Sequence, residues 1–270
     1  GSLEILTEAA REAGPALPLT LRGVEFLRPG LVSDGAETRL SVEVARVEDA
    51  ARITLSDGAG DGANVTALVV PLAAPAAPPA GPPPPPRGWD EDGGGRPLAS
   101  AQAPRMRFGP RWQVLRRSRI AGDAGVAELA LDPAYAGDLA QGYLLHPALM
   151  DIATGWAMAL IPGWTASHLW VPLGYDRLDL WRPLPARVTS HVRLTAATGG
   201  MARFDVTLTD PEGAVCCRIT GFALRRLDTA AAGFAAGPED APAHSAHPVH
   251  HDPGERRLAH LVAQGIPAAA

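Results

Sequence analysis

One carboxylate stands in an apolar stretch of the sequence where it could act as an acid. Residues 148–161 are apolar on every face of a helix, and Asp151 is the only charged side chain among them. A helix of that composition is typical of one surrounded by protein. A carboxyl group without a partner in an apolar site raises its pKa and holds its proton. Asp151 is therefore a candidate proton donor; the alternative is a buried carboxylate held by backbone amides or an arginine.

The elements that position Asp151 follow from the residues around it. Pro147 is typical of the first position of a helix, where an N–H group is not needed. The apolar run predicts that this helix extends over 147–161. A second helix is predicted over residues 3–13, with apolar residues at positions 3, 6, 10 and 13 and a stop signal at Gly14-Pro15.

Strands are expected between the two predicted helices and again after the second helix. The alternation of apolar and polar residues over Thr38–Val44 is typical of a strand with one buried face. Two units of one helix with antiparallel strands suggest an internal duplication. The expected strands are 19–28, 38–47, 51–57, 64–72, 111–120, 125–131, 169–181, 187–197, 203–209 and 214–226.

Four segments together resemble a known family. His146-Pro-Ala-Leu-Met-Asp151 resembles the HPALLD motif of the dehydratase domains of modular type I polyketide synthases, a double-hotdog family. The segments 22–29, 107–113 and 169–175 resemble further motifs of that family, in the family's order. The resemblance implies an α+β double hotdog, in which two antiparallel sheets each wrap a central helix.

The resemblance also implies how the chain is divided. Residues 1–72 would form the N-terminal hotdog, 73–104 a Pro/Gly/Ala-rich mobile linker, 105–228 the C-terminal hotdog, and 229–270 a flexible linker with the start of a following region. The family's catalytic base is a histidine in an HxxxGxxxxP motif before the first central helix. His146 is the first histidine here, so we expect an N-terminally truncated domain whose first hotdog is incomplete.

The reaction that the resemblance implies is removal of water from a 3-hydroxyacyl thioester on an acyl carrier protein. Asp151 would be the general acid and an upstream histidine the base, so we expect these 270 residues alone to be inactive. No metal and no cofactor beyond the carrier's phosphopantetheine is implied. The expected substrate-binding residues are Tyr143, His146, Gly109, Pro110, Pro172 and Leu173.

Two positions depart from the family's pattern. Gly155 stands where the family often has Gln or His, on the same helix face as Asp151, and Phe108 stands where it often has Tyr. Either the acid has different support here, or the domain has lost activity. The alternatives to a dehydratase are a non-catalytic double-hotdog binding module of the synthase and a related cyclase-type enzyme.

The composition of the chain excludes several classes of partner and mechanism. Hydrophobic residues make up 46% of the chain and the net charge is −5, so no basic field favours nucleic acid. All basic residues are arginine, and the absence of lysine excludes Schiff-base and P-loop mechanisms. No apolar run is long enough to span a membrane. We expect a cytoplasmic protein whose partners are an acyl carrier protein, other domains of the same synthase and a second copy in a homodimer.

Three smaller features have simple interpretations. Adjacent Cys216 and Cys217 are expected to be packing residues. Residues 255–263 could form a short amphipathic helix at the start of a neighbouring domain. A histidine cluster could bind metal, but a flexible linker is favoured; its members are His244, His247, His250 and His251. An arginine-rich segment is either a patch for an acidic carrier protein or a set of outward-facing strand residues; its members are Arg105, Arg107, Arg111, Arg116, Arg117 and Arg119.

Overall fold

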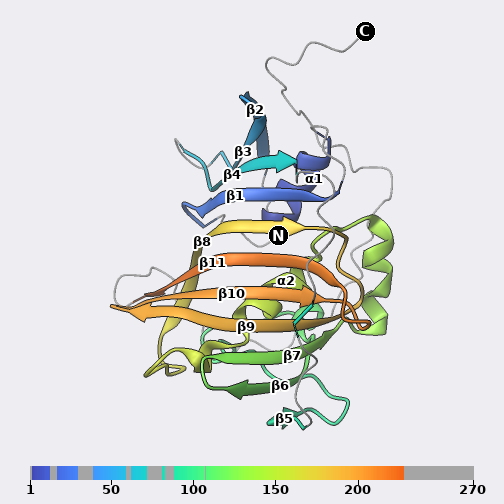
Figure 1. Cartoon of the computed structure of the whole chain (residues 1–270), viewed down its shortest axis with the longest axis vertical. Coiled ribbons are helices and arrows are strands. Elements are labelled where there is room, and N and C mark those ends of the chain that lie inside the picture. The colour runs from blue at the N-terminus through green and yellow to red at the C-terminus, as the bar shows by residue number, and fades with distance from the viewer. Residues whose placement is uncertain are drawn as a thin grey trace.

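In a computed structural model, one antiparallel sheet of eleven strands organises the described part of the chain (Figure 1). The described residues are 2–12, 17–29, 39–58, 62–71, 81–82, 88–106 and 108–227. The strands are β1 (Leu19–Phe26), β2 (Ser41–Val47), β3 (Ala50–Ser56), β4 (Val65–Pro71), β5 (Glu91–Asp92), β6 (Leu115–Ala121), β7 (Ala124–Ala130), β8 (Leu169–Leu180), β9 (Arg187–Thr198), β10 (Met201–Thr209) and β11 (Val215–Leu227). Their order across the sheet is β2-β3-β4-β1-β8-β11-β10-β9-β7-β6-β5.

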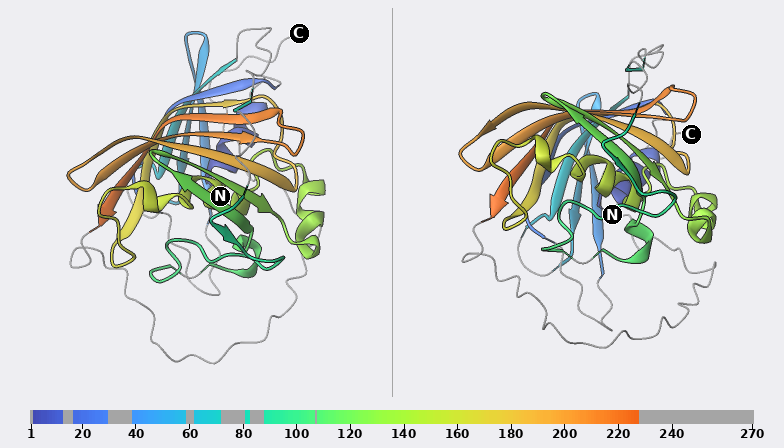
Figure 2. Two further views of the ribbon diagram at one scale, coloured as in Figure 1. Left: turned by 60° about the horizontal axis from the view of Figure 1, so that its bottom comes forward. Right: turned by 90° about the horizontal axis from the view of Figure 1, so that it is seen from below.

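The described residues contain two α-helices, which lie on the same side of this sheet. They are α1 (Ser2–Glu12) and α2 (Pro147–Gly155), and three 3-10 helices accompany them: η1 (Pro110–Trp112), η2 (Pro133–Gln141) and η3 (Met158–Leu160). Helix α1 packs against β3 and β4, whereas α2 packs against β7, β9 and η1. The sheet curves over both helices, as the two views of Figure 2 show. Each helix therefore belongs to its own half of the sheet.

The two halves meet where β1 pairs antiparallel with β8. Leu19 lies opposite Leu180, and Glu25 opposite Gly174. A Cβ atom at Gly174 would lie 2.1 Å from the carbonyl oxygen of Val24, so only glycine allows this close approach. The junction is continuous backbone pairing, and the two expected sheets are in fact one.

A polar contact reinforces the same junction. The hydroxyl of Thr20 on β1 donates to Oδ1 of Asp179 on β8 at 2.6 Å, and both residues are buried. Nε of Arg177 donates to the same carboxylate at 2.8 Å. Asp179 thus has two hydrogen-bond donors, which a buried carboxyl group needs.

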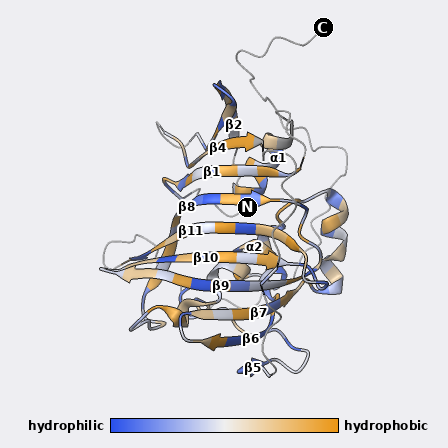
Figure 3. Ribbon diagram, viewed as in Figure 1, coloured by the Kyte–Doolittle hydropathy of each residue, from blue (hydrophilic) through white to orange (hydrophobic). Residues whose placement is uncertain are grey.

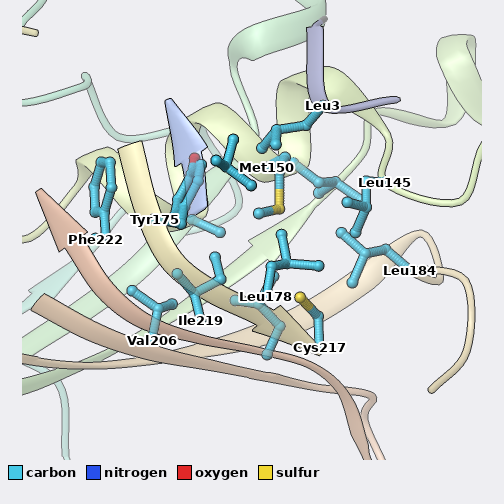
Figure 4. Packing of buried hydrophobic residues seen from close by; sticks show 14 of the residues in the cluster. Leu3, Leu145, Met150, Tyr175, Leu178, Leu184, Val206, Cys217, Ile219 and Phe222 are labelled. Atoms are coloured by element: carbon cyan, nitrogen blue, oxygen red, sulfur yellow. The ribbon is translucent and has the colours of Figure 1, made fainter. Parts of the chain in front are cut away.

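The apolar core lies between the sheet and the helices. The alternation of hydropathy along the strands is visible in Figure 3, and it matches strands with one face on a core. Figure 4 shows Leu3 of α1 beside Met150 of α2, with Leu178 and Ile219 of the sheet beneath them. Leu178 and Ile219 have no exposed surface. The two units therefore share one core, in which the central helices meet.

Most expected elements are confirmed. Each of the ten expected strands has a counterpart whose ends differ by a few residues. The helix expected over 147–161 is shorter: α2 ends at Gly155, and η3 follows as a single 3-10 turn. Glycine has the lowest helix propensity after proline, and it stands where the regular helix stops.

Residues 88–104, assigned to the linker from composition, are ordered along β6. The amides of Asp90, Gly93 and Leu98 donate to the carbonyls of Ser118, Arg116 and Leu115. These bonds extend the sheet edge beyond the two residues of β5. Composition missed this because Gly- and Pro-rich segments can still pair where side chains are not needed.

Of the remaining expectations, some are confirmed and others concern residues outside the described ranges. Cys216 and Cys217 are buried free thiols, as packing residues should be, and burial raises the pKa of Cys216 to about 11. The histidine cluster and residues 255–263 lie outside the described residues. No helix in the described part of the chain has the length and apolarity needed to cross a membrane.

Candidate active site

Asp151 lies in the second turn of α2, and its carboxylate is held by an indole. Nε1 of Trp112 donates to Oδ2 of Asp151 at 2.9 Å. The backbone helps to orient this helix, because the amide of Met150 donates to the carbonyl of His146, the N-cap residue. Pro147 occupies the first turn as expected. The sequence thus places an acid near a helix N-terminus, where N–H groups and positive potential gather.

Asp151 is exposed, so the expectation of an enclosed carboxyl is wrong. The direction of its pKa shift is nevertheless the expected one: desolvation by the surrounding protein raises the pKa, partly offset by the hydrogen bond from Trp112. Both observations hold for a carboxyl that solvent reaches from one side while protein crowds it from the others. Such a group can meet a substrate and still retain its proton to a higher pH than a free aspartate.

The indole of Trp112 is presented by η1, the short helix that begins in the glycine-proline pair of the 107–113 motif. Gly109 is the extended N-cap of η1, and Pro110 is its first residue. Both are exposed and lie in the element that contacts α2. Their expected contact with substrate stays a prediction. In the structure they form the start of η1, the element that places Trp112 against Asp151. Arg107 of the same motif lies outside the described residues.

Strand β8 contributes a buried tyrosine. Burial raises the pKa of Tyr175, and the negative charge of Asp151 adds to that rise. The Tyr175 ring stacks on Phe222 with ring centroids 5.1 Å apart. Pro172 is exposed and Leu173 half-buried on the same strand. Their role in binding stays a prediction, and Tyr175 is the buried aromatic residue of this motif.

A second polar cluster lies directly before α2. Nε2 of His146 lies 3.4 Å from Oδ2 of Asp138 in η2, and Nε of Arg111 donates to the same oxygen at 2.7 Å. Tyr143 meets the His146 ring edge-on, with ring centroids 5.5 Å apart. The Arg111 guanidinium lies 4.8 Å from the centre of the Tyr135 ring. This cluster ties η1 and η2 to the loop that enters α2.

The protonation states in this cluster follow from burial and pairing. Only 2% of His146 is exposed, and desolvation lowers its pKa despite the nearby Asp138. Burial would raise the pKa of Asp138, but hydrogen bonds with Arg111 and His146 hold it below its usual value. A neutral imidazole beside an arginine-paired carboxylate supports the loop structurally. The expected contact of His146 with substrate stays a prediction.

The residues that sequence reasoning missed are those that hold others in place. Trp112 and Asp138 could have been suspected from their positions within or beside quoted motifs, but nothing in the sequence pairs them with Asp151 and His146. Glu4 was counted only as part of a helix. Its carboxylate accepts hydrogen bonds from the backbone amides of Leu144 and Leu145. Contacts across 140 residues leave no mark in local spacing.

The arginine-rich segment is largely accounted for by contacts within the chain. Arg111 pairs with Asp138, and Arg117 lies within 3.7 Å of carboxylate oxygens of Asp92 and Glu128. The other described members donate to backbone carbonyls: Arg105 to Ala166, Arg116 to Ala130 and Arg119 to Gly88. These contacts favour the interpretation as outward-facing residues of the fold. Among the described residues, no group of three or more His, Cys, Asp or Glu could hold a metal ion.

Comparison with known proteins assigns a family to the region that contains this site. The model of the polyketide synthase dehydratase N-terminal domain matches residues 77–233, more than half of the chain. The chain belongs to the polyketide synthase dehydratase family. Such dehydratase domains are lyases in general. The matched residues include Trp112, Asp138, Asp151 and Tyr175, so the described site lies within the family region.

Curated relatives are much longer than this chain. Polyketide synthase PksM of Bacillus subtilis is 28% identical over 129 residues, which are 45% of this chain and 3% of that protein. PksN of the same organism is 28% identical over 121 residues, 45% of this chain and 2% of the relative. The dehydratase family therefore occurs within multidomain synthases.

Solved structures confirm the double-hotdog fold. A trans-AT synthase dehydratase domain from Brevibacillus brevis has a TM-score of 0.70 at 18% identity, covering 84% of each chain. The dehydratase domain of RzxB from Pseudomonas fluorescens has a TM-score of 0.63 at 23% identity, covering 82% of each chain. That of the curacin synthase module CurF has 0.67 at 15% identity, covering 84% of this chain and 82% of that one. At such identities the likeness establishes the fold alone.

Proposed function

We propose that this chain supplies the acid half of a dehydratase that removes water from a 3-hydroxyacyl thioester. A base takes the α-proton, and the electrons of that C–H bond form the double bond to the β-carbon. The C–O bond breaks as Asp151 gives its proton to the departing hydroxyl, so water leaves and an enoyl thioester remains. Hydroxide is a poor leaving group, which is why a protonated acid is needed.

The observation that carries the proposal is the environment of Asp151. Its carboxyl is open to solvent, yet desolvation raises its pKa, and Trp112 fixes one of its oxygens. An aspartate that keeps its proton towards neutral pH can act as a general acid. The proposed base is a histidine, as in the family's HxxxGxxxxP motif, and residues 1–145 contain none.

The proposal also names the partners of the reaction. The substrate arrives on the phosphopantetheine of an acyl carrier protein, and no other cofactor is needed for an elimination of this type. Other domains of the same synthase and a second copy of the domain are the proposed protein partners, in the cytoplasm. Neither nucleic acid nor membrane takes part.

The test is Asp151→Asn in the synthase module that contains this chain. A carrier-bound 3-hydroxyacyl substrate loses the mass of one water on dehydration, so mass spectrometry gives the rate. We expect the rate to fall by about 10²–10⁴, the usual contribution of a general acid. Asp123→Asn is the control, because Asp123 is exposed and pairs with Arg193 at the surface. A wild-type rate in Asp151→Asn would remove Asp151 from the mechanism.

A further inference from the structure

The carboxylate of Glu4 in α1 is buried and lies against the other unit of the molecule. Only 5% of the residue is exposed. Oε1 accepts the amide of Leu144 at 2.8 Å, and Oε2 accepts the amide of Leu145 at 2.5 Å. Each oxygen therefore has its own donor, and both donors are backbone groups of consecutive residues. A buried carboxylate is tolerated when such donors replace water.

The chain before α2 is shaped to present these two amides. Helix η2 ends at Gln141, and its C-cap residue Gly142 has a φ of 85°, a left-handed conformation that glycine adopts without strain. Successive N–H groups that point to one side form a concave site for an anion. The carbonyl of Leu144 accepts the amide of Leu184, which follows β8. The loop is thus held by α1 through its amides and by the second unit through a carbonyl.

Only one residue separates this clamp from α2. His146 follows Leu145 directly and is the N-cap of the helix that carries Asp151. Because a helix is rigid, its position and rotation are set largely by how its first turn is held. Glu4 also lies in the first turn of α1, so the carboxylate is near the N-termini of both central helices, where negative charge is stabilised.

We infer that Glu4 is a positioning residue for the dehydration: it clamps the loop of Leu144 and Leu145, and so fixes where α2 presents Asp151. This inference rests on the proposed function of Asp151. The acid belongs to one hotdog and the proposed base to the other, so their separation depends on a contact between the two units. Glu4 supplies a contact of that kind, directly at the entrance to the acid's helix.

Two measurements on the same synthase module test the clamp. Glu4→Gln keeps the size of the side chain but turns one acceptor into a donor, so it can accept only one of the two amides. Hydrogen–deuterium exchange of the peptide containing Leu144 and Leu145 should become about tenfold faster, the factor expected for one lost hydrogen bond. The value of kcat should fall by up to about 10²-fold with KM little changed, because displacement of a catalytic group has effects of that size.

Glu8→Gln is the matched control, since Glu8 lies one turn later on the same helix and is half-buried. It should change neither the exchange of that peptide nor kcat. Glu4→Asp should restore part of kcat, because both oxygens remain acceptors on a shorter stem, and it provides a second variant if Glu4→Gln folds poorly.

Unchanged exchange at Leu144 and Leu145 in Glu4→Gln would overturn the clamp. If kcat fell by the same factor in Glu8→Gln as in Glu4→Gln, the positioning role of Glu4 would be overturned. Failure of the proposed function is seen separately, as normal turnover in Asp151→Asn, and in that case the exchange measurement still decides whether the clamp exists.

Discussion

The two central helices each place a carboxylate near their N-terminus, and the two carboxylates differ in burial and in the donors that they meet. Glu4 of α1 is buried and accepts two backbone amides from the opposite unit. Asp151 of α2 is exposed and accepts one indole N–H. Desolvation raises the pKa of Asp151. Glu4 is thus held between the two units by two backbone donors, whereas Asp151 has one side-chain donor and stays open to solvent.

The comparison teaches that burial alone does not identify a catalytic acid. Sequence reasoning looked for a carboxyl enclosed in apolar surroundings, and Glu4 fits the burial part of that description better than Asp151 does. What distinguishes the proposed acid is that a substrate can reach it. The first unit therefore contributes to the site by holding the second in position, and this division of roles can be tested at the junction, at the acid and at the end of α2.

The largest expected effect is at the junction of the two units. Gly174→Ala would bring a Cβ atom to 2.1 Å from the carbonyl oxygen of Val24, so β1 and β8 must separate locally. Overpacking of this kind destabilises by roughly 1–3 kcal/mol. Urea unfolding should show a lower midpoint, and turnover should fall as well if the first unit positions the acid. Gly137→Ala is the control, because a Cβ there meets no atom within 4 Å. Equal stability of the two variants would mean that β1 and β8 can separate locally at Gly174 without a cost in free energy.

An intermediate effect is expected at the acid itself. Trp112→Phe keeps an aromatic ring but removes the N–H that stabilises the charged form of Asp151. The pKa of Asp151 should rise further, because desolvation, its main cause, is then less opposed. An acid catalyst is active while protonated, so the alkaline fall of the dehydration rate should move to higher pH. NMR titration of the Asp151 carboxyl carbon measures this directly; a fall in pKa would mean that the ring, rather than its N–H, sets the environment.

The sign of the linkage to stability follows from the same shift. A carboxyl whose pKa is raised in the folded protein binds its proton more tightly there than in the unfolded chain. Asp151 therefore favours folding at low pH and disfavours it as the pH rises through the unfolded pKa and then the folded one. The variant Asp151→Asn should remove this part of the pH dependence of unfolding.

Local sequence patterns predicted most of the fold because they report local physics. Alternation placed the strands, and Pro147 placed the start of α2. The shared sheet was not predicted, since nothing in β1 or β8 states which strand is its neighbour. The ordered edge at 88–104 was missed because its backbone hydrogen bonds need no particular side chain.

For the site, the motif that contains Asp151 was informative and its surroundings were not. The sequence predicted a carboxyl at the start of a helix and the direction of its pKa shift. It did not predict the exposure of Asp151, or that Trp112 and Glu4 act on α2 from η1 and α1. Those contacts join residues 39 and 140 or more positions apart, and such pairs are set by tertiary packing.

The smallest expected effect is at the end of α2, where Gly155 takes the place of a larger residue. Gly155→Ala should stabilise the protein by about 0.5–1 kcal/mol, because glycine is entropically unfavourable in a helix and an added Cβ meets no atom within 4 Å. Gly142→Ala is the matched control: its Cβ is equally free, but its φ of 85° strains an alanine, so that variant should be less stable than wild type. Thermal unfolding separates the two signs. Stabilisation without loss of turnover would show that α2 can be stiffened behind the acid, and that Asp151 depends on what holds the start of its helix. A large loss of turnover would instead mean that the end of α2 at Gly155 is part of the site.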